Sequence, residues 1–165
     1  MQTGIDTYVT REEADEYVQS HYPHESNPRN TWENLSQGER DTLLRAACLE
    51  LEVLPWNGRT VSEEQLLAFP RTDKLRSRGE EYLTFSAVPL PVKYAQIELA
   101  LWMTDSAAQA ERGQRTELQS QGVTGYKLGD LSERYGGRFR IPAPLAVPRC
   151  AALIGRYLNG GCSVY

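Results

Sequence analysis

Two histidines, His21 and His24, are the first residues to consider for chemistry, because imidazole serves as a metal ligand and as a general base. Their spacing would let both approach one metal ion, but no Cys, Asp or Glu pattern completes a zinc site around them. We therefore expect His21 to be half-buried at a helix end and His24 to lie in a loop. The sequence predicts no metal site and no cofactor.

Nucleophilic catalysis has little support in the sequence, which contains neither a G-x-S-x-G elbow nor a Walker motif. Three cysteines, Cys48, Cys150 and Cys162, are an odd number at wide spacing, which indicates reduced thiols. Arg149 beside Cys150 would lower the pKa of that thiol, but no partner base is apparent. We predict no catalytic residue and a protein that is not an enzyme; a small enzyme of unknown chemistry is the third-ranked interpretation.

Basic residues interleaved with aromatic residues occur in two stretches, and this mixture suits stacking platforms for single-stranded nucleic acid. One stretch runs from Phe69 to Tyr82 and includes Arg71, and the other covers residues 134–140. The whole chain, however, carries a net charge of −4, whereas dedicated nucleic-acid binders are usually strongly basic. Charge therefore argues against nucleic-acid binding, and solvated loops or arginines paired with acidic faces are the favoured interpretation.

The charge is distributed unevenly along the chain. Residues 1–111 contain 10 Lys/Arg and 19 Asp/Glu, whereas residues 112–165 contain 8 Lys/Arg and 3 Asp/Glu. An acidic body joined to a basic C-terminal third suggests two surfaces that meet two kinds of partner. Ordinary scatter of surface charge explains the same numbers equally well.

Length and composition limit the architecture to one domain, or one domain with extensions, because the chain has 165 residues. A hydrophobic content of 40% and a mean hydropathy of −0.54 allow a modest core, which we expect neighbouring subunits to complete. No stretch approaches the roughly 18–20 apolar residues that span a bilayer, and no signal peptide is evident. We therefore expect no membrane partner.

Hydrophobic periodicity predicts two amphipathic helices in the first third of the chain. Capping boxes begin at Thr10 and Ser36, where a Glu three residues later reaches back to the cap. Pro23 and Pro55 end these helices, because proline cannot continue the helical hydrogen bonds. Residues 24–30, polar and interrupted by proline, are expected to form a loop.

The most apolar helix follows Pro89 and Pro91, and its hydrophobic stripe runs from Val92 to Ala110. A helix that is apolar on most sides is central in its bundle or buried between subunits. The stretch before it, residues 56–91, is the least regular, and we expect a long loop there with a short helix beginning at Ser62.

Glycine-spaced segments after this helix predict a β-hairpin over about 117–136, turned at Gly129-Asp130. Three prolines in residues 141–148 predict an extended linker that carries the last helix away from the body. The predicted fold is mainly α: a small helical bundle with a β-hairpin and an extended C-terminal arm ending in a helix. The predicted parts are a helical domain over residues 1–140 and a linker, helix and tail over residues 141–165.

Several sequence motifs also follow one another in a specific order. They are Tyr8–Tyr17, Leu54–Arg59, Leu67–Thr72, Pro91–Ala95, Gly129–Tyr135 and Arg156–Gly161. In this order they resemble the small head–tail connector (adaptor) proteins of tailed bacteriophages, one sub-family of which is labelled DnaT-like single-stranded DNA-binding. The resemblance covers nearly the whole chain. Phe69 departs from it, because tryptophan is usual at that position.

The resemblance implies a structural protein of the virion neck, assembled in the host bacterial cytoplasm. Copies would form a ring, typically of twelve, that extends the channel for double-stranded DNA without binding it specifically. The implied partners are the portal protein above and the next connector or tail protein below. The alternative interpretation is a single-stranded DNA-binding replication accessory protein.

Three groups of candidate interface residues accompany these expectations, with aromatic side chains as typical anchors. The portal-interface candidates are Arg149, Arg156, Tyr157, Leu158, Val164 and Tyr165. The subunit-interface candidates are Tyr126, Leu128, Leu131, Arg134 and Tyr135 of the hairpin, and the loop candidates are Trp56, Phe69 and Arg71.

Overall fold

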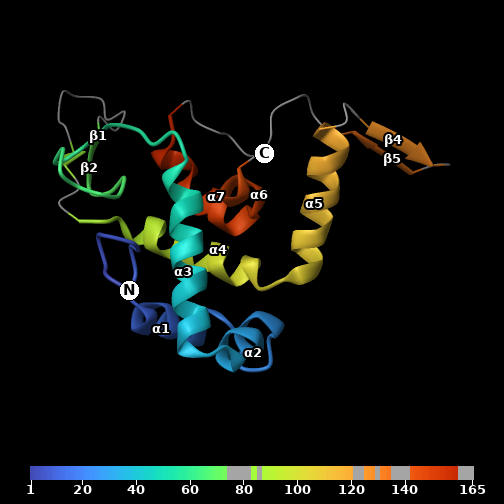
Figure 1. The fold of residues 1–165 in the computed structure, drawn as a ribbon, viewed down its shortest axis with the longest axis horizontal. Coiled ribbons are helices and arrows are strands. Elements are labelled where there is room, and N and C mark those ends of the chain that lie inside the picture. The colour runs from blue at the N-terminus through green and yellow to red at the C-terminus, as the bar shows by residue number, and fades with distance from the viewer. Residues whose placement is uncertain (74–82, 85–86, 121–124, 129–130, 135–141, 160–165) are drawn as a thin grey trace.

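A computed structural model describes residues 1–73, 83–84, 87–120, 125–128, 131–134 and 142–159 of the chain. Its helices form a packed body, from which one helix and a hairpin extend to the side (Figure 1). The helices are α1 (Arg11–His21), α2 (Asn27–Asn34), α3 (Gln37–Glu52), α4 (Leu90–Met103), α5 (Ser106–Ser120), α6 (Ala143–Ala146), α7 (Pro148–Ile154) and the 3-10 turn η1 (Gly155–Tyr157). The strands are β1 (Arg59–Thr60), β2 (Arg71–Asp73), β3 (Leu83–Thr84), β4 (Gly125–Leu128) and β5 (Leu131–Arg134). The mainly α prediction, with a hairpin and a C-terminal helix, is confirmed.

Both predicted capping boxes are present. The Thr10 hydroxyl accepts from the Glu13 backbone N–H at 3.1 Å, and the Glu13 carboxylate accepts from the Thr10 N–H at 2.9 Å. Ser36 and Glu39 make the same reciprocal pair at the start of α3. Each box satisfies backbone donors that a helix start otherwise leaves unpaired.

Helix α2 lies where the sequence predicts a loop over residues 24–30, so that prediction is wrong from residue 27 onward. Pro28 occupies its first turn, where a missing N–H costs nothing. Trp32 anchors the helix: it is 1% exposed, and its indole N–H donates to the Asp15 carboxylate at 2.7 Å. With 8 residues and a single buried side chain, α2 has no repeated spacing of apolar residues that would predict a helix from the sequence.

Helix α4 is the centre of the body, as predicted, and it buries residues on every side. Its buried Gln96 is fully hydrogen-bonded: the amide N–H group donates to the Thr7 hydroxyl and the Leu44 carbonyl, and the amide oxygen accepts from the Tyr8 N–H. The predicted continuation of α4 to Ala110 is wrong, because the helix ends at Met103. A separate helix, α5, then begins at Ser106.

The described C-terminal residues pack on the body. Helix α7 lies against α4, and α6 contacts α3, α4 and α7. Cys150, Ala151 and Ile154 are buried in the same core as residues of α1 and α3. The prediction that a linker carries the last helix away from the body is therefore wrong for residues 142–159. The proposed division at residue 140 stays a prediction.

Residues 56–91 contain short strands in place of the predicted continuous loop. β1 pairs antiparallel with β2, and β2 pairs antiparallel with β3. The helix expected from Ser62 is absent from residues 61–70, which the structure describes.

The predicted hairpin is confirmed as the antiparallel pair β4–β5, with Gly125 opposite Arg134 and Leu128 opposite Leu131. It is narrower than predicted, because residues 117–120 belong to α5. The predicted turn at residues 129–130 lies outside the described residues.

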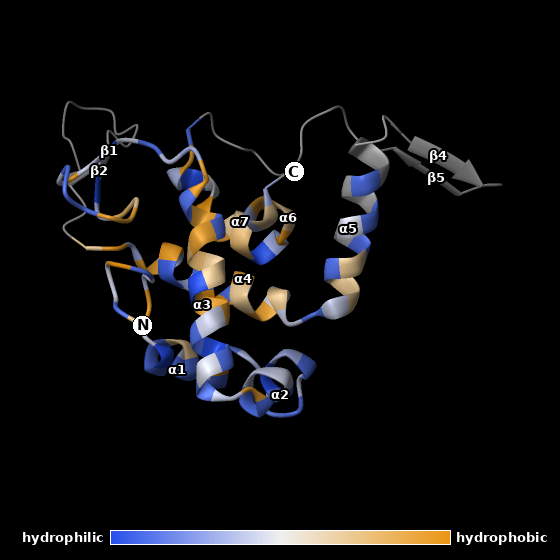
Figure 2. Cartoon of the chain, viewed as in Figure 1, coloured by the Kyte–Doolittle hydropathy of each residue, from blue (hydrophilic) through white to orange (hydrophobic). Residues whose placement is uncertain are grey.

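Apolar residues concentrate where α3, α4 and α7 meet, whereas α1, α2 and α5 are largely hydrophilic on the visible side (Figure 2). Burial of the large apolar side chains in this region is the main stabilising contribution to the fold. Among the described helices, none has both the length and the apolar character needed to cross a membrane.

Candidate functional site

Three of the sequence motifs, separated along the chain, meet at the C-terminal end of α3. The Asn57 N–H donates to the Tyr157 carbonyl at 2.8 Å, and the Asn159 N–H donates to the Pro55 carbonyl at 2.8 Å. Trp56 and Leu158 form an antiparallel bridge between these two bonds. The backbone therefore joins the 54–59 motif to the 156–161 motif.

An aromatic cluster lies directly beneath this junction and consists of Tyr8, Trp56, Phe69 and Tyr157. The Phe69 ring contacts the other three rings edge-on, with centroid distances of 4.9 Å to Trp56, 6.0 Å to Tyr8 and 6.4 Å to Tyr157. Such edge-to-face pairs are favourable beyond their buried area. The four residues are at most 6% exposed, so they form core and offer no open stacking platform.

Glu52 connects the aromatic cluster to α3. Its carboxylate accepts from the Tyr8 hydroxyl and, at 2.7 Å, from the Ala68 backbone N–H. Burial raises the pKa of Glu52, and burial together with the bond to Glu52 raises the pKa of Tyr8. This carboxylate fixes the segment around Phe69 to the helix, a structural role that the sequence does not indicate.

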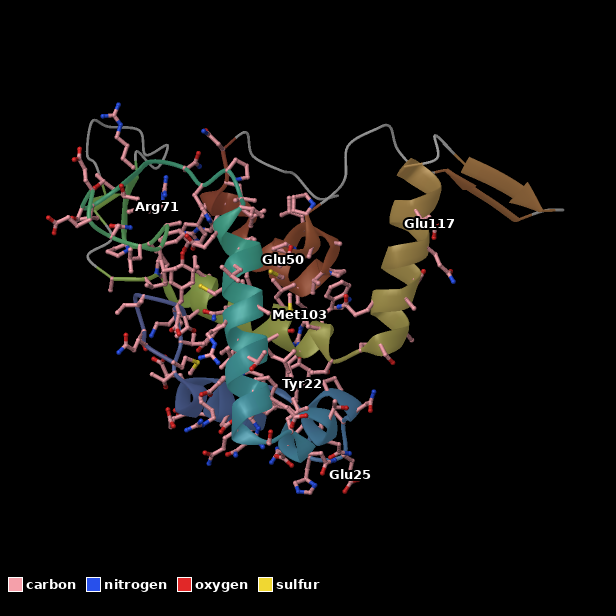
Figure 3. All side chains as sticks on the ribbon, in the orientation of Figure 1. Tyr22, Glu25, Glu50, Arg71, Met103 and Glu117 are labelled. Atoms are coloured by element: carbon pink, nitrogen blue, oxygen red, sulfur yellow. The ribbon has the colours of Figure 1, made fainter. Side chains whose placement is uncertain are left out.

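Arg71, a predicted loop candidate, is occupied by backbone carbonyls. Its guanidinium donates to the carbonyls of Asn57 at 2.7 Å, Gly58 at 2.8 Å and Ala68 at 3.1 Å. Figure 3 shows Arg71 beside β1 and β2. The side chain therefore stabilises the junction, and its guanidinium donors are largely used there.

Two further arginines lie at the surface of the junction. Arg59 lies two residues after Asn57, and Arg156 directly precedes Tyr157, whose carbonyl accepts from the Asn57 N–H. Both side chains are exposed, and the Arg156 guanidinium lies 5.1 Å from the centroid of the Tyr157 ring. Neither has a carboxylate partner in the part of the chain that the structure describes. These cations are available to an external ligand.

The exposed side of α7 and η1 extends this surface; we call it the α7 face and define it by Arg149, Ala152 and Arg156. These three residues are exposed and follow the i, i+3, i+7 spacing that places side chains on one side of a helix. Residues 148–157 contain no Asp or Glu. The α7 face is therefore a positively charged strip without intervening carboxylates.

A buried polar network holds the N-terminal end of this strip. Glu98 of α4, only 4% exposed, accepts from the hydroxyls of Tyr17 at 2.6 Å and Tyr22 at 2.7 Å, and from Arg149 at 3.1 Å. The Arg149 guanidinium also lies 5.0 Å from the centroid of the Tyr22 ring. Burial and the bond to Glu98 raise the pKa of Tyr22 to about 12. Arg149 is thus positioned by Glu98, while 58% of its side chain remains exposed.

A groove of about 470 Å³ opens beside Arg149. It lies between α2, the junction of α4 with α5, and the start of α7. Its lining includes Tyr22, Thr31, Trp102, Asp105 and Arg149. Figure 3 places Tyr22 near α2, well away from Arg71. Arg149 lies over the Tyr22 ring, whereas Arg156 directly precedes Tyr157 at the junction. The α7 face therefore runs from the groove to the junction.

Cations elsewhere in the body are neutralised. Every Lys and Arg of helices α1 to α4 makes an ion pair. The pairs are Arg11–Asp41 (3.2 Å), Arg29–Glu33 (2.7 Å), Arg40–Asp15 (3.1 Å), Arg45–Asp6 (3.7 Å) and Lys93–Glu13 (2.6 Å). Because these charges are compensated, that side of the protein offers anions little attraction.

The remaining candidates are placed as follows. Tyr157 and Leu158, predicted as portal anchors, are 5% and 3% exposed and belong to the core. The hairpin candidates Tyr126, Leu128, Leu131 and Arg134 lie in β4 and β5, whose side chains are outside the described part. Tyr135, Val164 and Tyr165 lie outside the described residues.

The histidine and cysteine side chains that the sequence offers for chemistry pack against neighbouring residues. His21 stacks on Tyr17 with ring centroids 4.1 Å apart, and the described residues contain no cluster of His, Cys, Asp and Glu that would hold a metal ion. Burial raises the pKa of the Cys48 and Cys150 thiols to about 12. The predicted lowering of the Cys150 pKa by Arg149 is wrong, because the thiol is buried in the core.

Comparison with known proteins gives one match. A family model described as "Putative DnaT-like ssDNA binding protein" matches residues 1–165. No curated protein and no solved structure matches the chain.

This match overturns the prediction of a phage head–tail connector that binds the portal and extends the DNA channel. It agrees with the alternative prediction of a single-stranded DNA-binding protein. The net charge of −4, which argues against nucleic-acid binding, is a sum over surfaces whose cations differ in their pairing. The partner and location predictions stay predictions.

Proposed function

This chain belongs to the DnaT-like ssDNA-binding protein family, and from that premise we propose that it binds single-stranded DNA through the α7 face without catalysing a reaction. The observation that carries the proposal is the pair of exposed arginines, Arg149 of α7 and Arg156 of the following 3-10 turn η1, in a segment that has no carboxylate. Phosphate contacts from Lys and Arg supply most of the affinity in non-specific DNA binding. An exposed arginine strip is therefore the property that this function requires.

The spacing of the arginines suits a phosphate backbone. Arg156 is seven positions after Arg149, which places the two roughly 10 Å apart along the helix axis at about 1.5 Å per residue. Arg59 is also exposed and lies two residues from Asn57, whose N–H donates to the Tyr157 carbonyl at the same junction. A strand that follows α7 would meet several guanidinium groups in turn, each able to donate two hydrogen bonds to one phosphate.

The acidic composition of the chain does not oppose this function. Salt screens charges over a Debye length of about 8 Å at physiological ionic strength, so a phosphate responds mainly to nearby groups. The carboxylates of Asp6, Glu13, Asp15 and Asp41 are paired with cations of α1, α3 and α4. Glu98, beneath Arg149, is buried and already accepts three hydrogen bonds.

The proposal is tested by fluorescence anisotropy with labelled oligo(dT) over a range of salt concentrations. Wild-type protein should bind, and the logarithm of its affinity should fall linearly with the logarithm of salt concentration. The R59A/R156A double variant should bind more weakly, with a salt slope smaller by about 1.4, because each lost contact to a single strand contributes about 0.7.

A matched control removes the same charge from the paired side of the protein. The R11A/R45A double variant also loses two arginines, both of which are paired with carboxylates. It should keep the wild-type salt slope. Equal slopes for all three proteins would exclude the α7 face as the binding surface, and no binding of oligo(dT) by folded wild-type protein would overturn the function itself.

A further inference from the structure

The groove beside Arg149 has the size and the position of a ligand site on the proposed DNA path. Its volume of about 470 Å³ falls within the range of about 300–1,000 Å³ that ordinary small-molecule pockets occupy. It opens directly next to Arg149, at the N-terminal end of the α7 face. A strand whose phosphate contacts Arg149 would therefore have its bases within reach of the groove.

The walls of the groove offer flat surfaces for stacking. The Tyr22 ring is fixed by its hydroxyl, which donates to Glu98 at 2.7 Å, and the Arg149 guanidinium covers one of its faces. Trp102 lines the same groove and is partly exposed. Aromatic rings and guanidinium planes are the surfaces on which proteins stack unpaired bases.

The two carboxylates in the lining are both compensated. Glu98 accepts from Arg149 and from the hydroxyls of Tyr17 and Tyr22. Asp105 caps α5, since one of its carboxylate oxygens accepts from the N–H groups of Ala107 and Ala108 at 3.0 Å each. Its charge also lies at the positive end of the helix dipole. An anionic strand can therefore approach the groove without facing an uncompensated carboxylate.

We infer that this groove receives one unpaired base of the bound strand, stacked against Trp102 and the Arg149–Tyr22 pair, while Arg149 contacts the adjacent phosphate. The inference rests on the proposed single-stranded DNA binding and assigns part of it to a defined pocket. Thr31, Asn27 and Ser106 also line the groove and supply hydrogen-bonding groups to the edge of a base. A paired base could not enter, so the groove would make binding selective for single strands.

Tryptophan fluorescence provides the test. The chain has three tryptophans, and Trp32 and Trp56 are only 1% and 6% exposed, so Trp102 is the one that an external base can reach. Adding oligo(dT) should quench the emission of wild-type protein. The W102F variant should lose the quenching yet keep its affinity, because phenylalanine also stacks. The W32F variant is the matched control and should keep the quenching.

Affinity gives a second readout. The W102A variant should bind oligo(dT) roughly 5- to 100-fold more weakly, the range that loss of one stacked base produces, while its circular dichroism remains that of a folded protein. An abasic deoxyribose-phosphate strand of the same length should bind wild-type and W102A proteins equally. This comparison separates base stacking from phosphate contacts.

The outcomes distinguish the two proposals. Salt-dependent binding without quenching, and with equal oligo(dT) affinity for wild-type and W102A proteins, would overturn the base pocket and leave single-stranded DNA binding intact. Quenching that persists in W102F would likewise overturn it. If folded wild-type protein binds neither oligo(dT) nor the abasic strand, the proposed function fails and the pocket fails with it.

Discussion

The two sides of this protein use arginine in opposite ways. On the side formed by α1, α2 and α3, Arg11, Arg29, Arg40 and Arg45 each face a carboxylate within 4 Å. On the α7 face, Arg156 faces solvent, and Arg149 keeps most of its side chain exposed although Glu98 holds one end. The comparison teaches that the number of cations does not identify a binding surface. Exposure separates the two sides, because Arg149, although paired with Glu98, keeps 58% of its side chain exposed, against 16–40% for the four arginines of the other side.

The largest effect that we expect concerns Glu98, the group that fixes the N-terminal end of the α7 face. E98A leaves Arg149 and the hydroxyls of Tyr17 and Tyr22 without their shared acceptor. Leaving a buried hydroxyl without its acceptor typically costs about 1–3 kcal/mol of unfolding free energy, and E98A does this to two tyrosines at once. Urea denaturation measures this loss. A loss below 1 kcal/mol would mean that the network does not hold α7 to α4.

The junction beside Gly58 should show a smaller effect that separates two neighbouring arginines. R71A removes the charged donors to the carbonyls of Asn57, Gly58 and Ala68, and a hydrogen bond from a charged group contributes about 1.5–3 kcal/mol. R59A, at the position that pairs with Thr72 in the same small sheet, should change stability by no more than about 0.5 kcal/mol. Equal losses in urea denaturation would contradict the structural assignment of Arg71.

Alkaline pH should weaken the same network from the other direction. The folded-state pKa of Tyr22 is about 12, above its ordinary value of 10.0, so the folded protein retains this proton longer than the unfolded chain. Its contribution to stability is complete below pH 10 and is lost as pH rises toward 12. Thermal unfolding between pH 8 and pH 12 should show this decline, and Y22F should decline less steeply. Identical pH profiles would exclude Tyr22 as a contributor.

The smallest effect is expected on the compensated side. K93A breaks the bond between the Lys93 ammonium and the Glu13 carboxylate, at 2.6 Å, on the protein surface. Surface ion pairs contribute about 0–1 kcal/mol, so stability should change little. Oligo(dT) affinity should also stay unchanged, although the variant carries one positive charge fewer. A loss of affinity comparable to that of R156A would remove the distinction between the two sides.

Local signals in the sequence predicted helices α1 and α3 and the start of α4. The caps at Thr10 and Ser36 and the apolar pattern of α4 act over neighbouring residues, so they can be read from one chain. Helix α2 was not predictable in this way, because its stability comes from one buried tryptophan that bonds to Asp15 of another helix. The break after Met103 depends on Asp105, whose capping role competes with a continuous apolar pattern.

The candidate site was predictable only in part. Arg149 and Arg156, predicted as portal-interface residues, are exposed on the α7 face, and the partner predicted for them stays a prediction. We predicted exposed contacts for Arg71 and Tyr157. In the structure, the Arg71 guanidinium donates to backbone carbonyls, and the Tyr157 ring lies in the buried aromatic cluster. Every residue type has a backbone carbonyl, so the sequence cannot indicate that Arg71 bonds to carbonyls. The Arg149–Glu98 contact could not be predicted either, because it joins residues 51 positions apart. Such long-range contacts decide which arginines remain available.

The most direct test of this account is an NMR titration of the isotope-labelled, full-length protein with oligo(dT). The account predicts that the largest amide and arginine side-chain shift changes fall at residues 57–60 and 148–159, with Trp102 and the groove residues Asn27 and Thr31 of α2 also affected and α1 and α3 unchanged. Shift changes concentrated on Arg11, Arg29, Arg40 and Arg45, with none on α7, would contradict it.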